Sequence, residues 1–315
     1  MPSKKTILIS GVSGHFARGL LPLLARDPSV GRIIGIDRQE PPADPSGKLE
    51  FHPLDVRDPA ATKLMKGCDV FIHMAFILLR RPGQEDVDEI NIGGSRMLLD
   101  AAAAGGVKKI IFTGSVVGYG MHADNPLPLT EEHPLRPNID LYYSKAKAIV
   151  EQHLDEIETA HPGITVTRLR PCTVAGPKTE KARMASLISR TGVLIKGFNP
   201  PIQLLHEKDL ANAIHLAVVK PLPGAYNVTG DGPQTLRELY AVSKARVMEL
   251  PLPIARFLMG FAWSTGQSIF SADWIDLSRF SLVASNRKIK QAGWKPEYST
   301  LQTFREVLQA HGVKS

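Results

Sequence analysis

Short apolar runs, rich in Val and Ile, alternate with longer segments of mixed polarity through the first two thirds of the chain. Near-continuous apolar runs of this length are typical of strands that are buried on both faces of a sheet. We expect such strands over residues 7–9, 32–37, 49–54, 70–75, 109–115, 165–170 and 225–228.

The segments between these runs predict helices and one Pro-rich loop. We expect helices over residues 16–25, 59–65, 86–104, 141–160, 235–248 and 301–309, a strand-to-helix step over 204–219 and a loop over 41–48. Strands and helices that alternate in this order predict an α/β fold, a doubly wound parallel sheet with helices on both faces.

The stretch from Thr6 to Ala17, TILISGVSGHFA, joins the first strand to the first helix through a glycine-containing turn. Gly11 allows the tight turn, Gly14 lets the backbone approach a ligand closely, and Ala17 lets the helix pack on the strand. The free N–H groups and the positive end of the helix dipole would then face an anionic group. Glycine turns of this kind also occur without a nucleotide, so the stretch predicts a dinucleotide pyrophosphate site only together with its context.

An acidic residue at the end of the second strand supplies that context. Asp37 can accept hydrogen bonds from both hydroxyls of an adenosine ribose, and it would repel a 2′-phosphate. We therefore expect a Rossmann-like fold with NAD in preference to NADP, although Arg38 is a residue type that serves a 2′-phosphate. Asp55 follows the third strand, where it can meet the adenine amine, and the small residues Met74 and Ala75 leave space for the dinucleotide.

The pattern becomes irregular after residue 171, where proline and aromatic residues are mixed with short helical pieces. We expect an NAD-binding domain formed by residues 1–171 together with about 204–228, and a smaller substrate-binding lobe formed by 172–203 and 229–315. The lobe would lie over the strand ends, where open α/β sheets bind their ligands.

Composition and charge narrow the function classes. The chain has 315 residues, 43% hydrophobic and 22% charged, and its formal charge of +7 comes from scattered Lys and Arg residues, which does not indicate nucleic-acid binding. The longest apolar run, 70–79, is too short for a membrane span, and it is interrupted by His73, which we expect to be structural. Cys68 and Cys172 are far apart and the first strand begins close to the first residue, so we expect a cytoplasmic protein without disulfides or a signal peptide.

One predicted helix carries a pair of residues with the spacing of an acid–base catalyst. Tyr143 and Lys147 are four positions apart and so share a helix face. A free phenol titrates near pH ~10, and an ammonium one turn away would favour the phenolate and lower its pKa. The tyrosine can then exchange a proton with a substrate oxygen while a nicotinamide exchanges hydride with the carbon, and Ser115 at the end of the fifth strand can hydrogen-bond the same oxygen. The Tyr-x-x-x-Lys spacing also arises by chance, and the surrounding fingerprint makes it informative; we expect no metal site.

Motifs along nearly the whole chain follow one family pattern. They read SGVSGHFA, GID, LDVRD, HMA, NIGGSRMLLDAA, FTGSVVGYG, YYSKAK, LRPCTVAGP, LLHEKDLA, GAYNVTGDG and QAGWKP. In these motifs the chain resembles the extended short-chain dehydrogenases/reductases, the NAD-dependent epimerase/dehydratase group. The resemblance places the family's serine, tyrosine and lysine on Ser115, Tyr143 and Lys147. Tyr142 does not fit, because Ala146 stands four positions after it.

The resemblance also implies a cofactor site and a quaternary structure. Family cofactor contacts fall on Gly11, Gly14, Asp37, Asp55, Ala75 and Asn91, with Lys147 reaching the nicotinamide ribose, and the expected site extends to His15, Phe16, Arg38, Val56, Met74, Tyr143 and Pro171. The family commonly dimerises through the helices expected here over 86–104 and 141–160, which implies a homodimer. Met97, Leu98, Ile149 and Val150 are candidate interface residues unless all four face the sheet.

Departures from the family pattern bear on the substrate. Family dehydratases carry an Asp-Glu pair where this chain has Val116 and Val117, so a 4,6-dehydratase is not expected. Nucleotide-sugar members usually carry an asparagine and often an arginine where this chain has Thr173 and Ile202. We therefore expect an NAD-dependent oxidoreductase acting on a secondary alcohol or carbonyl of a small molecule. The alternatives are a nucleotide-sugar C4 epimerase with tightly bound NAD and, less favoured because the tyrosine and lysine are intact, a non-catalytic dinucleotide sensor.

Overall fold

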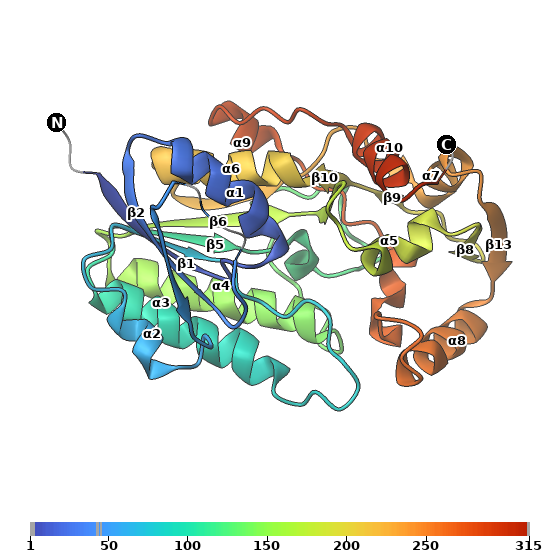
Figure 1. Cartoon of the computed structure of the whole chain (residues 1–315). Coiled ribbons are helices and arrows are strands. Elements are labelled where there is room, and N and C mark those ends of the chain that lie inside the picture. Colours follow the sequence, from blue (N-terminus) through green and yellow to red (C-terminus); the bar gives the residue numbers. More distant parts are fainter. Residues whose placement is uncertain (1–3, 42–43, 45, 314–315) are drawn as a thin grey trace.

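A seven-stranded sheet lies at the centre of the larger part of the molecule (Figure 1). The computed structural model describes residues 4–41, 44 and 46–313. Positions 42, 43 and 45 of the expected loop lie outside the described residues. The strands are β1 (Lys5–Ser10), β2 (Val30–Asp37), β3 (Leu49–Pro53), β4 (Val70–His73), β5 (Lys109–Thr113), β6 (Thr165–Pro171) and β11 (Gly224–Val228). Their spatial order is β11-β6-β5-β4-β1-β2-β3, and all neighbouring pairs are parallel. The order reverses between β1 and β4, so the predicted doubly wound sheet is confirmed.

Helices cover both faces of this sheet (Figure 1). Ile7 and Ile9 of β1 pack into one hydrophobic cluster with α1 (His15–Arg26) and α6 (Glu207–Val219). Leu8, between them, packs into a second cluster on the opposite face. The helices of that second face are α2 (Pro59–Lys63), α3 (Ser95–Ala104) and α4 (Tyr142–Ala160). Because both faces are covered, the strands are apolar throughout rather than alternating.

The fourth and fifth strands end earlier than the sequence predicted, and one helix begins differently. The fifth strand was expected to reach Ser115 but ends at Thr113. The fourth strand was expected to reach Ala75 but ends at His73. Met74 and Ala75 turn away beneath Gly11, where a Cβ would lie 2.6 Å from the Ala75 backbone nitrogen. The helix expected over 86–104 begins as a π-helical turn, η1 (Glu89–Gly94), and only then continues as α3, because two consecutive glycines weaken the regular helix there.

Most of the rest of the chain forms small two-stranded ladders and short helices at the carboxyl ends of the large sheet, whereas α9 (Arg287–Gln291) lies beside β11 (Figure 1). The ladders pair β7 (Thr173–Ala175) with β10 (Leu204–His206), β9 (Pro201–Ile202) with β12 (Gln234–Thr235), and β8 (Thr191–Ile195) with β13 (Arg246–Leu250). The helices are α5 (Lys181–Ile188), α7 (Leu236–Val242), α8 (Leu252–Ser264), α9 (Arg287–Gln291) and α10 (Thr300–Ala310), with 3₁₀ turns η2 (Val116–Tyr119) and η3 (Ala272–Ser278).

The helix predicted over 235–248 is wrong in its second half. Helix α7 ends at Val242, and Lys244 adopts a left-handed φ of +54° that a continuing helix excludes. The chain then extends as β13 and pairs in parallel with β8. The pairing partner lies more than fifty residues earlier in the sequence, so the local pattern held no sign of it.

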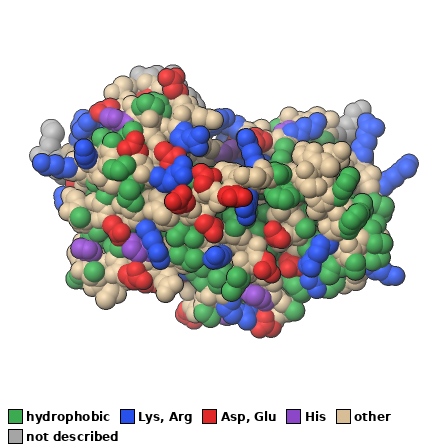
Figure 2. Space-filling model, turned by 90° about the horizontal axis from the view of Figure 1, so that it is seen from below, with side chains coloured by type: hydrophobic (Ala, Val, Ile, Leu, Met, Phe, Trp, Pro, Cys, Tyr) green, Lys and Arg blue, Asp and Glu red, His purple; other side chains and the backbone are tan. Residues whose placement is uncertain are grey.

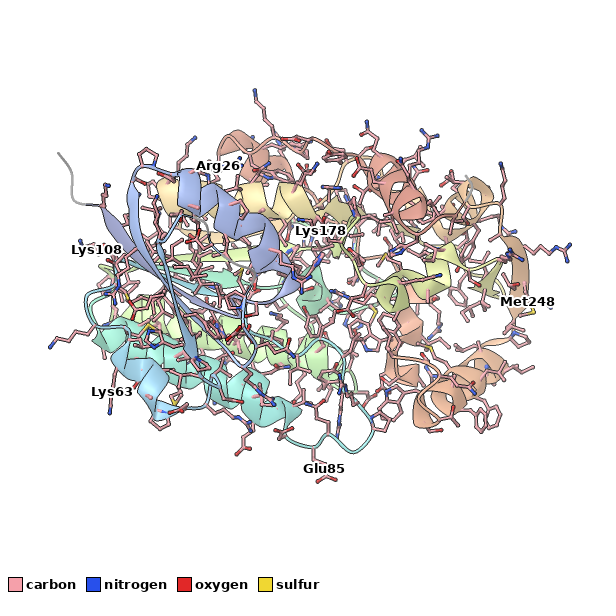
Figure 3. All side chains as sticks on the ribbon, in the orientation of Figure 1. Arg26, Lys63, Glu85, Lys108, Lys178 and Met248 are labelled. Atoms are coloured by element: carbon pink, nitrogen blue, oxygen red, sulfur yellow. The ribbon has the colours of Figure 1, made fainter. Side chains whose placement is uncertain are left out.

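Charged side chains are spread over the outside of the molecule, among exposed hydrophobic ones. Arg26, Lys63 and Lys108 project outward from the helices and strand ends around the large sheet (Figure 3). Over the face that carries α3 and α4, Lys and Arg alternate with Asp and Glu, so no stripe of one sign appears there (Figure 2). Within the described part of the chain, no helix is long and apolar enough to cross a membrane.

Two of the four candidate interface residues face the sheet instead. Leu98 and Val150 are fully buried in the second cluster, whereas Met97 and Ile149 remain partly exposed. Their helices α3 and α4 pack side by side, because one face of each must cover the sheet. The prediction that all four residues are free for an interface is therefore wrong for Leu98 and Val150.

Candidate active site

The turn between β1 and α1 forms the floor of the site. Gly11 has a φ of +78°, and its backbone lies so close to Ala75 that only glycine fits. The Gly14 N–H donates to the Gly11 carbonyl at 3.1 Å, and His15 and Phe16 open α1 immediately afterwards. The first N–H groups of the helix have no partner within it. The predicted strand, turn and helix are therefore present in the expected order.

Positive charge surrounds this turn. Nε2 of His15 lies 3.2 Å from Oε2 of Glu207. Burial and, to a lesser degree, nearby positive charges together lower the pKa of His15 to about 4, so the imidazole is neutral at neutral pH. Those charges belong to Arg183, Arg18 and Lys178. Free N–H groups, a helix N-terminus and three cations together suit a bound anion.

Asp37 lies at the end of β2, next to the glycine turn. Its carboxylate accepts the Ser13 N–H at 3.1 Å and the Gln39 N–H at 3.2 Å. Arg38 beside it is exposed to solvent. The acid therefore stands where the sequence predicted the ribose site, and it also fixes the turn that precedes α1.

Two other predicted cofactor residues are engaged in contacts of their own. Oδ1 of Asp55 accepts from the backbone N–H and from Nε of Arg57, both at 2.9 Å, and hydrogen bonding to Arg57 lowers the pKa of the carboxyl. The amide of buried Asn91 bonds to both backbone groups of Ile77, at 2.7 and 2.9 Å. Val56 packs closely on the backbone of Gly94, just before α3. These residues shape the loops around the cleft, and their direct contact with a cofactor stays a prediction.

His73 is structural, as expected. Its Nδ1 lies 2.5 Å from Ser10 Oγ and its Nε2 lies 2.7 Å from Ser95 Oγ, so the ring joins β1, β4 and α3. Burial, followed by the charge of Lys147, lowers the pKa of His73 to about 3. The buried ring is therefore neutral at neutral pH, and both of its nitrogens are engaged by serine hydroxyls.

Ser115 and Tyr143 meet at the carboxyl edge of the sheet. Ser115 follows β5 and caps η2, where its Oγ accepts the Val117 N–H at 3.2 Å. Tyr143 belongs to the first turn of α4 and packs edge-on against Phe76, with ring centres 5.6 Å apart. The predicted serine and tyrosine therefore come together from separate elements.

Lys147 lies one helical turn after Tyr143 and is buried. Its Nζ donates to the carbonyl oxygen of Thr113 at 2.6 Å and lies 3.5 Å from the centre of the Phe76 ring. The distance from Nζ to the centre of the Tyr143 ring is 5.5 Å. The ammonium is thus held at the end of β5, between the tyrosine and the glycine turn.

The pKa of Tyr143 is raised, which contradicts the expectation that Lys147 lowers it. Burial raises this pKa to about 12, while the charge of Arg183 and a hydrogen bond from Ser115 act in the opposite direction. Burial also lowers the pKa of Lys147 to about 7, against the charge of Glu151. A lysine with this pKa is largely uncharged above neutral pH and cannot then stabilise a phenolate. The prediction that Lys147 lowers the pKa of Tyr143, which was made from their spacing alone, therefore fails.

Two cavities meet at this point. One of about 250 Å³ is lined by Gly11, Gly14, His15, Met74, Phe76, Thr113 and Lys147. The other, of about 240 Å³, is lined by Ser115, Pro171, Cys172, Thr173, Ile202 and Trp274, among others. Phe16, Leu78, Tyr143 and Arg183 line both. The tyrosine therefore stands between a space next to the glycine turn and a space under the second part of the chain.

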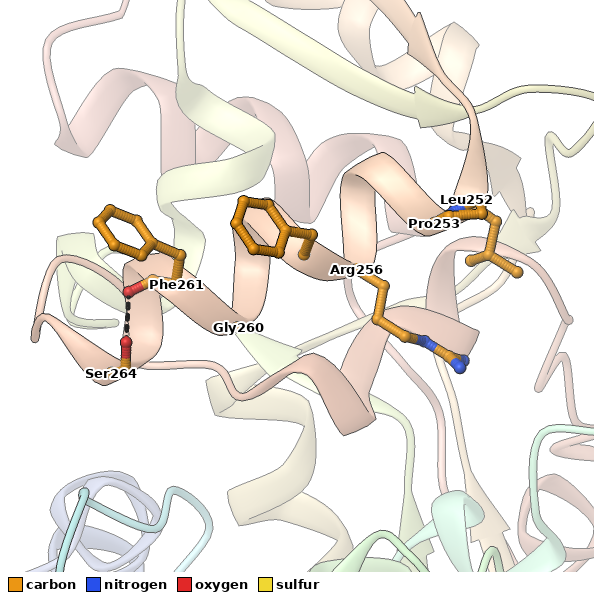
Figure 4. A pocket seen from close by; sticks show the side chains of 7 residues that line it. Leu252, Pro253, Arg256, Gly260, Phe261 and Ser264 are labelled. Carbon is orange, nitrogen blue, oxygen red and sulfur yellow. Dashed lines mark hydrogen bonds between the residues drawn. The ribbon is translucent and has the colours of Figure 1, made fainter.

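A third hollow lies on α8, away from these residues (Figure 4). It is lined by exposed Phe257 and Phe261, and Arg256 is the charged residue beside them. None of the predicted site residues lines it. Among the described residues, no group of three or more His, Cys, Asp or Glu side chains has the arrangement of a metal site.

Comparison with known proteins assigns the family. Residues 7–229 match the model of the NAD dependent epimerase/dehydratase family, which covers most of the chain. The chain belongs to this family. It is therefore an enzyme of the extended short-chain dehydrogenase/reductase class with NAD as its cofactor, and the resemblance found in the sequence is confirmed.

Relatives of this family member span different functions. It is 24% identical over 326 residues to an uncharacterized protein of Mycobacterium tuberculosis, covering 98% of this chain and 85% of that protein. It is 31% identical over 194 residues to sterol demethylase protein B of Methylococcus capsulatus, covering 59% of this chain and 56% of that protein. The structure of UDP-glucose 4-epimerase from Thermus thermophilus in complex with NAD superposes with a TM-score of 0.74 at 19% identity, covering 97% and 98% of the two chains. Identity this low shows a shared fold.

The residues of the first cavity fit the family's cofactor. A Cβ at Gly11 would fill the space beside Ala75, so the chain keeps its backbone open there. Asp37 offers carboxylate oxygens beside the glycine turn, and Lys147 offers an ammonium that lines this cavity. Groups of the charge that NAD requires therefore stand near the glycine turn, and their contact with the cofactor stays a prediction.

Arg183 is the residue of this site that the sequence analysis missed. It lies on α5, in the stretch KTEKARMAS, where neither periodicity nor a motif singles out one cation among three. Its place in both cavities depends on how the second part of the chain folds over the strand ends. No local signal in the sequence carries that information.

Proposed function

We propose that this family member is an oxidoreductase that exchanges hydride at a secondary alcohol or carbonyl carbon of a small molecule, with Ser115, Tyr143 and Lys147 as its catalytic residues. One observation carries the proposal: Tyr143 lines both cavities, with Lys147 on the side of the glycine turn and Ser115 on the other side. A substrate oxygen in the second cavity would meet the serine and the tyrosine together.

Each residue has a separate role in this proposal. When bound, NAD accepts the hydride that leaves the alcohol carbon. The Tyr143 oxygen takes the alcohol proton, or returns it in the reverse direction, and Ser115 Oγ orients the reacting oxygen. Lys147, held by the carbonyl of Thr113, anchors the cofactor ribose. Arg183 and Ser115 both act to lower the pKa of Tyr143 and so oppose the larger effect of burial, which raises it.

Cofactor content and turnover test this proposal. Purified protein should release NAD on denaturation or bind it when added, and it should reduce or oxidise a member of a panel of secondary alcohols and ketones. Tyr143→Phe should retain NAD and lose turnover. A Tyr143→Phe variant with unchanged turnover would instead support the reading as a non-catalytic dinucleotide sensor.

A nucleotide-sugar C4 epimerase is the second candidate, supported by the fold shared with UDP-glucose 4-epimerase. Thr173 and Ile202, which replace the usual asparagine and arginine, both line the second cavity and weaken this candidate. Interconversion of UDP-glucose and UDP-galactose without added NAD would establish it. An NADH signal that depends on an added alcohol would favour the oxidoreductase.

The predicted division of the chain belongs to the same proposal. Residues 1–171 with about 204–228 would form the NAD-binding domain, and 172–203 with 229–315 the substrate lobe. The division is supported by the large sheet, which takes its strands only from the first group. Two buried, free cysteines, Cys68 and Cys172, are consistent with a cytoplasmic location.

A homodimer through α3 and α4 also remains part of the proposal. It is supported by Met97 and Ile149, which stay partly exposed on these two helices. Light scattering at micromolar concentration should give twice the mass of one chain, and Ile149→Lys should give the single chain. A single-chain mass for the unmodified protein would remove the dimer from the account.

A further inference from the structure

We propose that Arg183 binds a carboxylate of the substrate, and that the substrate is otherwise an apolar body held in the second cavity. The inference rests on the proposed function, because it names the substrate class of the same site. It follows from the lining of the cavity, the surroundings of the guanidinium and the place of the guanidinium beside Tyr143.

The second cavity is built for an apolar ligand. Most of its lining is aliphatic or aromatic, including Leu78, Val174, Leu187, Ile202, Trp274 and Leu282. Its polar groups are few: Ser115 and Tyr143 at one end, and three hydroxyl side chains elsewhere. Burial of hydrocarbon favours binding in such a space, whereas an unpaired sugar hydroxyl is penalised there. A hydrocarbon framework carrying the reacting oxygen fits this lining better than a sugar does.

Arg183 is the charged residue among the described side chains of this cavity. Burial lowers its pKa, which means that its cation is poorly solvated. The Arg183 backbone N–H donates to the Glu180 carbonyl at 3.0 Å, but among the described residues its guanidinium makes neither a hydrogen bond nor an ion pair, and Glu180 acts on it only through its charge. The two buried arginines among the described residues, Arg168 and Arg170, are both paired, Arg170 with Glu151 at 2.6 Å. The partly buried guanidinium of Arg183 has no such acidic partner and lines the cavity, so it is a site for an incoming anion.

The fork of a single guanidinium matches a carboxylate. Two parallel N–H groups bind both oxygens of one carboxylate, and one positive charge balances its single negative charge. A diphosphate carries more charge than one arginine offers, and the position of the usual second arginine is Ile202. The chemistry therefore favours a monocarboxylate over a nucleotide diphosphate.

The anion belongs to the substrate rather than to the cofactor pyrophosphate. Arg183 also stands near the glycine turn, but the pyrophosphate position there has the helix N–H groups, Arg18 and Lys178 without it. Arg183 extends past this turn into the second cavity and acts on the charge of Tyr143. A carboxylate held there would lie within the same cavity as the reacting carbon.

Binding to the complex with NADH tests the proposal without requiring turnover. The probes are 2-, 3- and 4-acetylbenzoate, each paired with its uncharged methyl ester, and pyruvate, which lacks an apolar body. At least one acetylbenzoate should bind about tenfold or more tightly than its ester, as expected for a charge-assisted hydrogen-bond pair. It should also bind at least tenfold more tightly than pyruvate. Equal binding of every acid and its ester would overturn the proposal.

Two variants and a control test whether Arg183 causes the preference for the acid over its ester. Arg183→Gln should abolish the preference for the acid over the ester, and Arg183→Lys should restore part of it. Arg190→Gln, which removes an exposed arginine just after α5, should leave it unchanged. Two results would show that Arg183 does not bind the substrate carboxylate: Arg183→Gln keeps the preference for the acid, or it loses affinity for NADH instead of losing that preference. The result is independent of the Tyr143→Phe turnover test, so the two proposals can fail separately.

Discussion

Lys147 donates its hydrogen bond to the carbonyl oxygen of Thr113, at 2.6 Å, and not to the tyrosine one turn before it. Thr113 is the last residue of β5, so the strand end holds the ammonium in place. The lysine is buried, and its pKa is lowered to about 7. Its charge is therefore set by the environment of the strand end, and it changes within the physiological range.

Stability should depend on pH through Lys147. Its folded pKa of about 7 lies below the value of 10.5 for a free lysine, so the unfolded chain binds more protons between these pH values. The buried cation destabilises the fold fully below about pH 7, and this effect fades as the pH rises toward 10.5. Lys147→Met should therefore gain most, relative to the unmodified protein, at pH 6 and least at pH 9.5, measured by urea unfolding without cofactor.

The matched control for that measurement is Lys145→Met, at a partly exposed lysine of the same helix. Its difference from the unmodified protein should not follow the trend of Lys147→Met. A difference for Lys147→Met that stays constant from pH 6 to pH 9.5 would mean that the buried amine does not titrate there.

Asp37 should make the site prefer NAD to NADP. The carboxylate would pair with ribose hydroxyls and repel a 2′-phosphate, and it also holds the Ser13 N–H at 3.1 Å. Asp37→Ala should lower NAD affinity by about tenfold, since it removes one or two charge-assisted hydrogen bonds, and should affect NADP less. Titration of both nucleotides into both proteins measures this. If the unmodified protein binds NADP more tightly than NAD, and Arg38→Ala loses that preference, then Arg38 and not Asp37 determines the cofactor preference.

Gly114 should be irreplaceable for a packing reason. A Cβ at this position would lie 2.5 Å from Oε1 of Glu151, whose carboxylate pairs with buried Arg170. Gly114→Ala should therefore reduce the free energy of unfolding by about 1–3 kcal/mol through overpacking, or by about 3–5 kcal/mol when the ion pair breaks. Gly163→Ala, where a Cβ meets nothing within 4 Å, is the control and should be nearly neutral. Equal stability of the two variants would contradict this packing account.

The first half of the fold could be predicted because its determinants are local. Strands buried on both faces produce continuous apolar runs, such as Lys109–Thr113, and the turn at Gly11 requires a residue type that is visible in the sequence. The ladder between β8 and β13 could not be predicted, since its partners are distant and its strands are short and half exposed. The predicted helix over 235–248 failed for the same reason.

In the candidate site too, the features set by local sequence could be predicted and those set by the tertiary structure could not. Tyr143 and Lys147 share one helix, so their spacing predicts that they meet, and Ser115 follows from its place after a strand. The pKa values could not be predicted from spacing, because burial rather than distance sets them. Arg183 reaches the site through the folding of α5 over the sheet edge, which the sequence pattern does not encode.

Ser115→Ala should be the mildest of the catalytic substitutions. It removes one hydrogen bond to the reacting oxygen and the cap of η2, whose acceptor contact to the Val117 N–H is 3.2 Å long. A loss of one hydrogen bond corresponds to a roughly tenfold fall in kcat/KM. Steady-state kinetics with the substrate identified in the panel give this value. A fall larger than that of Tyr143→Phe would make the serine, and not the tyrosine, the principal catalyst.

Turnover of Tyr143→Phe, measured together with its NAD affinity, tests the central claim most directly. The substitution removes the hydroxyl that exchanges the proton and leaves the ring that packs on Phe76. General acid–base catalysis contributes about 10²–10⁴-fold, so kcat should fall by that factor while the dissociation constant for NAD stays within about twofold. Full turnover in Tyr143→Phe would contradict the account.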